Sequence, residues 1–92
     1  MNYFVYILRS EKSGRFYIGQ THDLGQRLKR HNGGRSTFTK TDRPWDLIFS
    51  ESYSTRSEAV RRERYLKSPQ GWKELKEIKK VILSNSERGA AR

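Results

Sequence analysis

The sequence predicts a small α/β fold in which a three-stranded, mainly antiparallel sheet is flanked by helices, in the order β-β-α-β-α-α. Two patterns predict it. Segments rich in β-branched and aromatic residues alternate with turn residues, which indicates strands, and other segments carry apolar residues at helical spacing. With 92 residues and 33% hydrophobic content, the chain can bury one modest core. We therefore expect one domain over residues 1–83 and a disordered C-terminal tail over residues 84–92.

The first two strands are predicted to form a hairpin. Residues 3–8 are apolar on both faces, which is typical of a central strand covered on both sides. Residues 10–14 are polar and end in glycine, so they form a turn, and residues 15–19 return as the second strand. Because side chains alternate along a strand, Tyr17 faces away from Ile18.

The first helix is predicted over residues 24–32. Asp23 has the side chain of an N-cap, and the glycines at 33–34 end the helix. Residues 35–44 are polar, basic and rich in threonine, which indicates a loop, and residues 46–53 form the third strand.

Two further helices follow the third strand. Thr55 and Glu58 form a capping box at the start of the second helix, and Pro69 ends this helix near residue 67. Residues 72–83, with Trp72 among their apolar positions, predict a final amphipathic helix.

The chain is strongly basic. It has 20 Lys and Arg residues against 10 Asp and Glu residues, which gives a formal net charge of +10. Such a charge favours an acidic polymer as partner, with nucleic acid first and an anionic membrane surface second. The alternative is a basic protein whose charge only keeps it in solution.

Other features of composition exclude several classes of site. The absence of cysteine excludes disulfides and thiolate metal sites and fits a reducing compartment, so we expect a cytoplasmic protein. Two histidines argue against a structural zinc site. The longest apolar run, residues 3–8, is too short to span a bilayer and lacks the flanks of a signal peptide, so we expect no membrane partner.

Two polar residues interrupt the apolar face of the first helix. By their spacing, this face comprises Leu24, Arg27, Leu28 and His31. Arg27 and His31 stand where an amphipathic helix normally carries leucine, which suggests a polar site. Alternatively, Arg27 reaches solvent at the edge of the face, and His31 is a cation favoured by the helix dipole.

The second helix carries a carboxylate on its apolar face. Glu63 shares this face with Ala59 and Leu66. Because a buried carboxylate without a partner is costly, Glu63 should bind a metal ion or pair with a cation such as Arg27.

Basic residues cluster on these two helices and on the loop after the first one. Such clusters usually form a solvated face, but beside two interrupted helix faces they indicate a surface that tracks phosphates. The residues that we expect to bind nucleic acid are Lys29, Arg30, Arg35, Lys40, Arg43, Arg61, Arg62, Arg64 and Lys67.

An ordered set of motifs resembles a known family. The motifs are Tyr17-Ile18-Gly19, the segment from Asp23 to Asn32 with its Arg27 and His31, Pro44-Trp45, and the segment from Ala59 to Lys67 with its Arg62-Glu63 pair. Over residues 1–83 the chain resembles the GIY-YIG nuclease superfamily, especially its small stand-alone bacterial members and the N-terminal nuclease domain of the excision-repair C subunit.

This resemblance implies a nuclease site. Its catalytic residues would be Tyr6, Tyr17, Arg27, His31 and Glu63, with Glu63 as the ligand of one divalent metal ion, usually Mg²⁺. Tyr6 would act as general base, with its pKa lowered by nearby cations. Arg27 would neutralise charge on the phosphate, while Tyr17 and His31 orient water and phosphate. We expect the site to occupy one concave, basic surface of the sheet.

The function implied is a metal-dependent endonuclease that hydrolyses DNA, rather than RNA, in repair or recombination. The sequence departs from the family at Phe4-Val5-Tyr6, which keeps only the tyrosine of the first signature, and at Gln20, where relatives carry lysine. The family's enzymes of known target carry a further domain for site selection, so a protein partner is expected to supply specificity. The alternatives are a non-catalytic nucleic-acid-binding module and an accessory protein of a repair complex.

Overall fold

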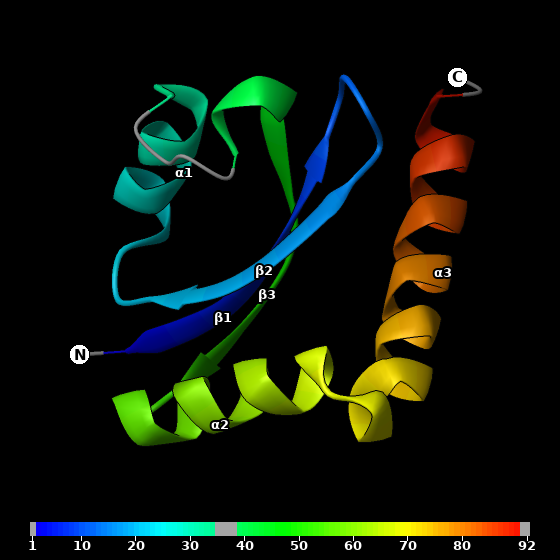
Figure 1. The fold of residues 1–92 in the computed structure, drawn as a ribbon. Coiled ribbons are helices and arrows are strands. Elements are labelled where there is room, and N and C mark those ends of the chain that lie inside the picture. Colours follow the sequence, from blue (N-terminus) through cyan, green and yellow to red (C-terminus); the bar gives the residue numbers. More distant parts are fainter. Residues whose placement is uncertain (1, 35–38, 91–92) are drawn as a thin grey trace.

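The structure, a computed structural model, describes residues 2–34 and 39–90. Its main elements follow the predicted order β-β-α-β-α-α, so the fold class is confirmed (Figure 1). The elements are β1 (Tyr3–Ser10), β2 (Phe16–Thr21), α1 (Leu24–Asn32), the short 3-10 helix η1 (Lys40–Asp42), β3 (Trp45–Tyr53), α2 (Arg56–Lys67), the 3-10 helix η2 (Pro69–Gly71) and α3 (Trp72–Ala90).

The sheet has the strand order β2-β1-β3, with β1 antiparallel to both neighbours. The central position of β1 confirms the expectation from its apolar residues on both faces. The pairing of β1 with β3 shifts register between Ile7 and Leu8, which leaves Ile48 as an extra residue on β3. The sheet therefore has two edge strands, β2 and β3, and β2 contributes to the site described below.

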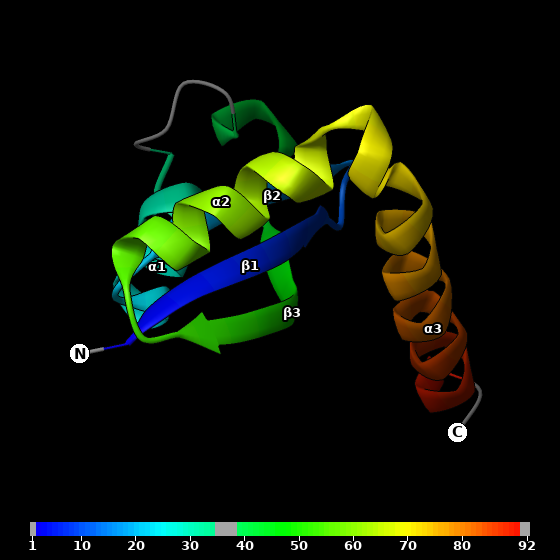
Figure 2. The same ribbon diagram turned by 90° about the horizontal axis from the view of Figure 1, so that it is seen from below.

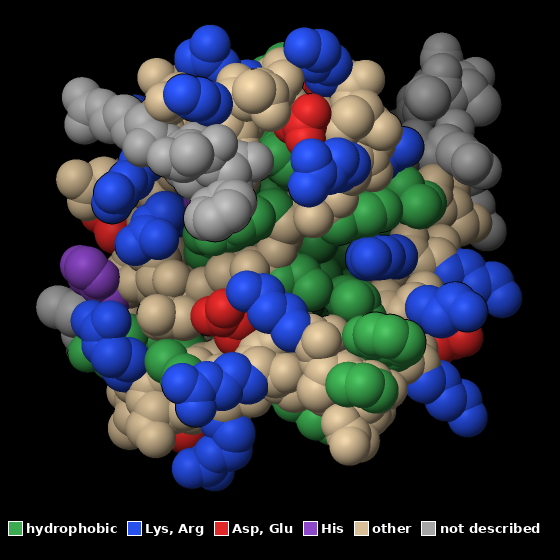
Figure 3. Space-filling model, viewed as in Figure 1, with side chains coloured by type: hydrophobic (Ala, Val, Ile, Leu, Met, Phe, Trp, Pro, Cys, Tyr) green, Lys and Arg blue, Asp and Glu red, His purple; other side chains and the backbone are tan. Residues whose placement is uncertain are grey.

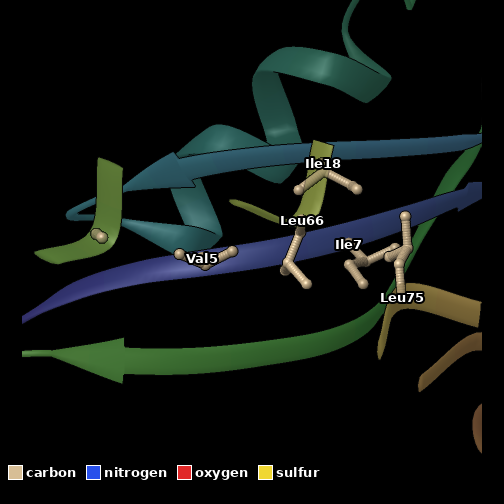
Figure 4. Packing of buried hydrophobic residues seen from close by; sticks show 6 residues of the cluster. Val5, Ile7, Ile18, Leu66 and Leu75 are labelled. Carbon is tan, nitrogen blue, oxygen red and sulfur yellow. The ribbon is translucent and has the colours of Figure 1, made fainter. Parts of the chain in front are cut away.

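The two faces of the sheet are covered by different helices. On one face, Val5 and Ile7 pack with Ala59 and Leu66 of α2 and with Leu75 of α3 (Figure 4). α1 covers the other face, as the view from below shows (Figure 2). The buried residues there are Tyr6, Leu8 and Trp45, and they pack against Tyr17, Leu24 and Leu28.

Local capping places both helices that flank the site. The Asp23 side chain accepts a hydrogen bond from the Gln26 backbone N–H at 3.0 Å, and α1 begins at the next residue. The Thr55–Glu58 capping box is present in both directions at the start of α2. Both predicted helix starts are thus confirmed, and the capping side chains on which the predictions were based form the expected hydrogen bonds.

The C-terminal helix differs from the expectation. It continues to Ala90 instead of ending at residue 83, so residues 84–90 are helical rather than a disordered tail. No proline or glycine occurs between 84 and 88, so the backbone hydrogen bonds of the helix can continue beyond its packed part. Trp72 is 57% exposed, because the helix docks through Leu75 and Ile78 instead. Within residues 2–34 and 39–90, no helix is long and apolar enough to cross a membrane.

Candidate active site

Tyr6 is the most buried functional side chain of the sheet, with 1% of its surface exposed. It lies opposite Gly19 of β2 in the strand register. A Cβ atom at Gly19 would stand 2.5 Å from the Tyr6 hydroxyl oxygen and 2.7 Å from Cζ. The Tyr6 ring therefore lies directly over the Gly19 backbone, and only glycine leaves room for it.

The Tyr6 hydroxyl belongs to a buried chain of hydrogen bonds. Its oxygen lies 3.2 Å from Nε2 of His31, and Nδ1 of His31 lies 2.9 Å from Oγ1 of Thr39. His31 and Thr39 are only 2% and 1% exposed. This contradicts the alternative in which His31 is a solvated cation at the helix terminus. Its imidazole instead bridges β1 to the segment before β3.

Tyr17 packs beside this chain. Its ring centroid lies 4.8 Å from that of His31 and 6.3 Å from that of Tyr6. Lys67 of α2 places its Nζ 5.9 Å from the centre of the Tyr17 ring and forms an ion pair of 2.7 Å with Glu63. The side chains of α2 thus reach around the edge strand β2 to a residue on the α1 face.

Arg27 and Glu63 both lie within electrostatic reach of the Tyr6 phenol. Burial raises the pKa of Tyr6, Tyr17 adds to the rise, the positive charge of Arg27 lowers it, and the Glu63 charge raises it further. The helices α1 and α2 cover opposite faces of the sheet, so Arg27 and Glu63 do not lie together over one face as expected. In this structure Glu63 pairs with Lys67, not with Arg27.

The pKa of Tyr6 is shifted in the opposite direction from the one expected for a general base. We expected nearby cations to lower the pKa of Tyr6, but desolvation outweighs the charge of Arg27 and the pKa rises above its usual value. For His31, burial lowers the pKa, and the charges of Arg27 and Arg30 lower it further. At neutral pH the site therefore holds a protonated phenol against a neutral imidazole.

These features coincide with a recognised family. A family model for the GIY-YIG catalytic domain matches residues 2–76. The chain belongs to the GIY-YIG family. This is a family of nucleases, and nucleic acid is the substrate class that membership implies.

The chain is also similar to several UPF0213 proteins. The chain is 45% identical over 67 residues to the UPF0213 protein YazA of Bacillus subtilis, covering 72% of this chain and 67% of YazA. It is 38% identical over 79 residues to a UPF0213 protein of Staphylococcus aureus, covering 85% of this chain and 95% of the relative. The solution NMR structure of the UPF0213 protein BH0048 from Bacillus halodurans matches with a TM-score of 0.51 and 32% identity, over 86% of each chain.

The geometry gives the second GIY-YIG signature a physical meaning. In Tyr17-Ile18-Gly19, Ile18 is buried in the core on the α2 face, Tyr17 lines the site, and Gly19 admits the Tyr6 ring. Tyr6 belongs to the first signature, which reads Phe4-Val5-Tyr6 in this chain. Of these three residues, only the tyrosine is needed for the contact with Gly19.

Most of the expected basic surface is exposed. Figure 3 shows Lys and Arg side chains spread over the viewed face with few acidic ones between them. Lys29, Arg30 and Arg27 help to line a cavity of about 1060 Å³ along α1. The exposed members of the expected set are Lys29, Arg30, Lys40, Arg43, Arg61, Arg64 and Lys67. Arg35 lies outside the described residues.

Arg62 has a different role from the one expected. Its guanidinium donates to both carboxylate oxygens of Glu51 on β3, at 2.9 and 3.2 Å, and also to Glu74 on α3. Its side chain is 19% exposed. Arg62 therefore holds α2, β3 and α3 together and is not free to contact a phosphate.

Glu63 is the candidate metal ligand. Among the described residues, no group of three or more His, Cys, Asp or Glu side chains could hold a metal ion. A single carboxylate suits Mg²⁺, which keeps most of its waters and binds through one or two carboxylates together with substrate phosphates. The exposed Lys67 ammonium is a weak competitor for Glu63, since surface ion pairs contribute little. The donor set thus fits Mg²⁺.

Sequence reasoning missed two residues that shape the site. Thr39 contacts His31 through its hydroxyl, and Asn32 clamps the start of β3 by accepting from the Trp45 N–H at 2.6 Å and donating to the Trp45 carbonyl at 3.1 Å. A threonine in a polar loop gives no signal in one sequence. The sequence indicated no role for Asn32 beyond its position next to His31.

Proposed function

We propose that this protein is a Mg²⁺-dependent endonuclease that hydrolyses DNA phosphodiester bonds, in DNA repair or recombination. The observation that carries the proposal is the hydrogen bond between the Tyr6 hydroxyl and His31 Nε2, within reach of the Arg27 and Glu63 charges. Pure binding surfaces have no need for a buried phenol–imidazole pair. DNA is favoured over RNA because the family's known enzymes cleave DNA.

Tyr6 and His31 act together on the attacking water. The raised pKa keeps the Tyr6 phenol protonated, so a preformed phenolate is not the base. Instead, the phenol oxygen accepts a proton from the water while the phenol O–H passes its own proton to His31 Nε2. The oxygen of the water bonds to phosphorus as the bond to the leaving oxygen breaks. The electron pair of that bond stays on the leaving oxygen, which then takes a proton from solvent. The neutral imidazole is the proton acceptor at neutral pH.

Cations stabilise the charge that develops on the phosphate. Arg27 is half-buried beside Tyr6, so its guanidinium acts in a partly water-excluded site, where a fixed donor is most effective. Glu63 would hold the Mg²⁺ ion, which when bound supplies positive charge to the phosphate and the leaving oxygen. Tyr17 lines the wall beside His31.

The test uses labelled nicked, branched and single-stranded DNA, with RNA of matched sequence, each with and without Mg²⁺. Wild-type protein should cut at least one DNA substrate only with Mg²⁺. Glu63→Gln keeps the shape of the side chain but removes its charge, so it should abolish cleavage and leave DNA binding intact or slightly tighter. Tyr6→Phe should lower kcat by about 10²- to 10⁴-fold. Equal rates for both variants and the parent would refute the proposal.

The exposed basic surface supports a second candidate, a non-catalytic nucleic-acid-binding module. This reading requires salt-sensitive binding with no cleavage of any substrate in the panel. If cleavage appears only after a cell extract is added, we propose that a protein partner supplies specificity. An accessory role in a repair complex is indicated instead if the protein neither cuts nor binds DNA at low salt.

A further inference from the structure

We propose that Thr39 is a positioning residue that holds His31 in the tautomer with its hydrogen on Nδ1, leaving Nε2 free to accept the Tyr6 proton. The catalytic consequence of this proposal rests on the proposed function. The tautomer itself does not depend on any cleavage.

Thr39 is rigidly placed for this role. It is 1% exposed, and its carbonyl accepts a hydrogen bond of 2.8 Å from Trp45 Nε1, itself a buried residue of β3. The Thr39 hydroxyl lies 2.9 Å from His31 Nδ1. Its backbone is thus anchored to the core, and its hydroxyl is directed at the imidazole.

The tautomer follows from the partners on the two ring nitrogens. A neutral imidazole has one N–H donor and one acceptor nitrogen. The buried Tyr6 phenol lies 3.2 Å from Nε2 and needs an acceptor for its O–H. If Nε2 accepts this bond, Nδ1 must carry the hydrogen, and a buried N–H needs an acceptor. The Thr39 hydroxyl oxygen supplies it.

The same arrangement serves the imidazolium formed during reaction. When Nε2 gains the proton, both ring nitrogens become donors. Nδ1–H keeps its bond to Thr39, so no group has to reorient on the Thr39 side. In the other tautomer, Nε2–H would point at the Tyr6 oxygen and His31 could not take the phenol proton. A residue that orients a histidine in this way affects its chemistry without touching the substrate.

The first arm of the test measures the tautomer by long-range ¹H–¹⁵N NMR correlation on ¹⁵N-labelled protein near neutral pH. His22 is exposed and serves as the internal reference, with a His22→Gln variant to assign its signals. We expect wild-type His31 to show a protonated Nδ1 and an unprotonated Nε2. A wild-type spectrum with hydrogen on Nε2 overturns the proposal without any variant.

The second arm uses matched variants. Thr39→Val removes the hydroxyl but keeps the branched shape, and Thr39→Ser keeps the hydroxyl. We expect Thr39→Val to shift His31 toward the Nε2–H tautomer and Thr39→Ser to keep the wild-type pattern. If the valine variant does not fold, as judged by amide spectra, Thr39→Ala replaces it. An unchanged tautomer after loss of the hydroxyl overturns the proposal.

The third arm is kinetic. Thr39→Val should lower kcat about 10- to 100-fold with KM unchanged, the range found when the hydrogen-bond partner of a metal-bound histidine is removed, and Thr39→Ser should recover most of the rate. A rise in KM alone would indicate a structural role and count against positioning. If no variant and no wild-type preparation cuts DNA while the NMR arms give the expected tautomers, the orientation stands and the proposed function fails.

Discussion

Gly19 has no side chain, and this absence places the Tyr6 ring. We predict that Gly19→Ala disturbs the site from a position that has no side chain of its own. The new Cβ would lie 2.5 Å from the Tyr6 hydroxyl oxygen, so the ring must move off His31. Stability should fall by about 1–3 kcal/mol, as in other overpacked positions, and kcat should fall about tenfold or more. Thermal denaturation and the cleavage assay measure the two effects.

Gly25 provides the matched control for this substitution. It lies in α1, and a Cβ there would stand 3.7 Å from Asp23 Oδ1, an ordinary contact. Because alanine favours the helix over glycine, Gly25→Ala should raise stability by about 0.5–1 kcal/mol and leave kcat unchanged. A Gly19→Ala protein that is as active as the Gly25→Ala protein would show that the Tyr6 position is not critical.

The charge state of His31 predicts how stability depends on pH. Burial lowers its pKa in the folded state, with Arg27 and Arg30 adding to the effect, while the protonated Tyr6 phenol faces the ring without a charge at neutral pH. Since the unfolded chain binds the proton more tightly, this contribution to stability is fully present above the unfolded pKa of about 6.5 and is lost as pH falls below it.

Denaturant unfolding at a series of pH values tests this expectation. The free energy of unfolding should decrease as pH falls through about 6.5, the pKa of an unfolded histidine. In His31→Gln, which cannot titrate, that part of the decrease should be absent. The exposed His22 provides the control variant, His22→Gln, for the removal of one histidine. Identical profiles for His31→Gln and wild type would contradict a neutral, buried imidazole.

At the scale of elements, Arg62 adds a polar link between α2, β3 and α3 to the apolar packing of α2 on the sheet. Its bidentate contact with Glu51 on β3 and its bond to Glu74 on α3 join three elements through one guanidinium. We predict that Arg62→Ala lowers stability by about 1–3 kcal/mol, because it leaves half-buried carboxylate oxygens without a partner. Chemical denaturation gives the value.

A comparison of Arg62 with the neighbouring Arg61 distinguishes a structural role from nucleic-acid binding. Arg61 is exposed on α2, so Arg61→Ala should change stability by no more than about 0.5 kcal/mol. At low salt, Arg61→Ala should weaken DNA binding more than Arg62→Lys does. Arg62→Lys keeps the positive charge, and the Arg62 side chain is already bound by carboxylates. The reverse order of affinities would place Arg62 on the DNA surface after all.

For the whole molecule, the net charge of +10 predicts binding that depends steeply on salt and little on sequence. If 6–10 phosphates are contacted, affinity should drop by roughly 10³- to 10⁵-fold between about 50 and 200 mM salt, because each neutralised phosphate releases counterions. Fluorescence anisotropy with two unrelated DNA sequences measures the slope and the sequence preference together.

Charge-removing variants locate this surface on the molecule. Arg64→Gln on α2 should reduce the salt slope by about one, the value expected for one lost phosphate contact. Lys80 is exposed on α3, outside the elements that form the site, and Lys80→Gln should leave the slope unchanged. Equal effects at both positions would indicate diffuse attraction by the net charge instead of a defined surface.

Much of the fold follows from patterns that span only a few residues. The Thr55–Glu58 capping box, the Asp23 cap and the apolar run of the central strand all act between near neighbours in the chain. Such local interactions are legible in one sequence because their partners lie at fixed offsets. The length of α3 was predicted incorrectly. The prediction ended this helix where its apolar pattern ends, but no local signal stops the backbone there, and the helix continues to Ala90.

The residues named for the candidate site remain a prediction, and the structure corrects the chemistry expected of Tyr6. Helical spacing singled out Arg27, His31 and Glu63, and the family resemblance added Tyr6 and Tyr17. Whether burial or Arg27 controls the Tyr6 pKa depends on how completely water is excluded from the ring, and only packing decides that. The same holds for Arg62, whose partners come from two other elements.

The sequence by itself determined the elements, their order, the family and the residue types available at the site, because these depend on local spacing and on side-chain chemistry. The tertiary structure alone decided which groups touch. Tyr6 and His31 are 25 residues apart in the chain, and Thr39, which contacts His31, lies eight residues after it. Contacts of this kind arise only when the sheet and helices pack, and the resulting loss of water sets which proton each group holds.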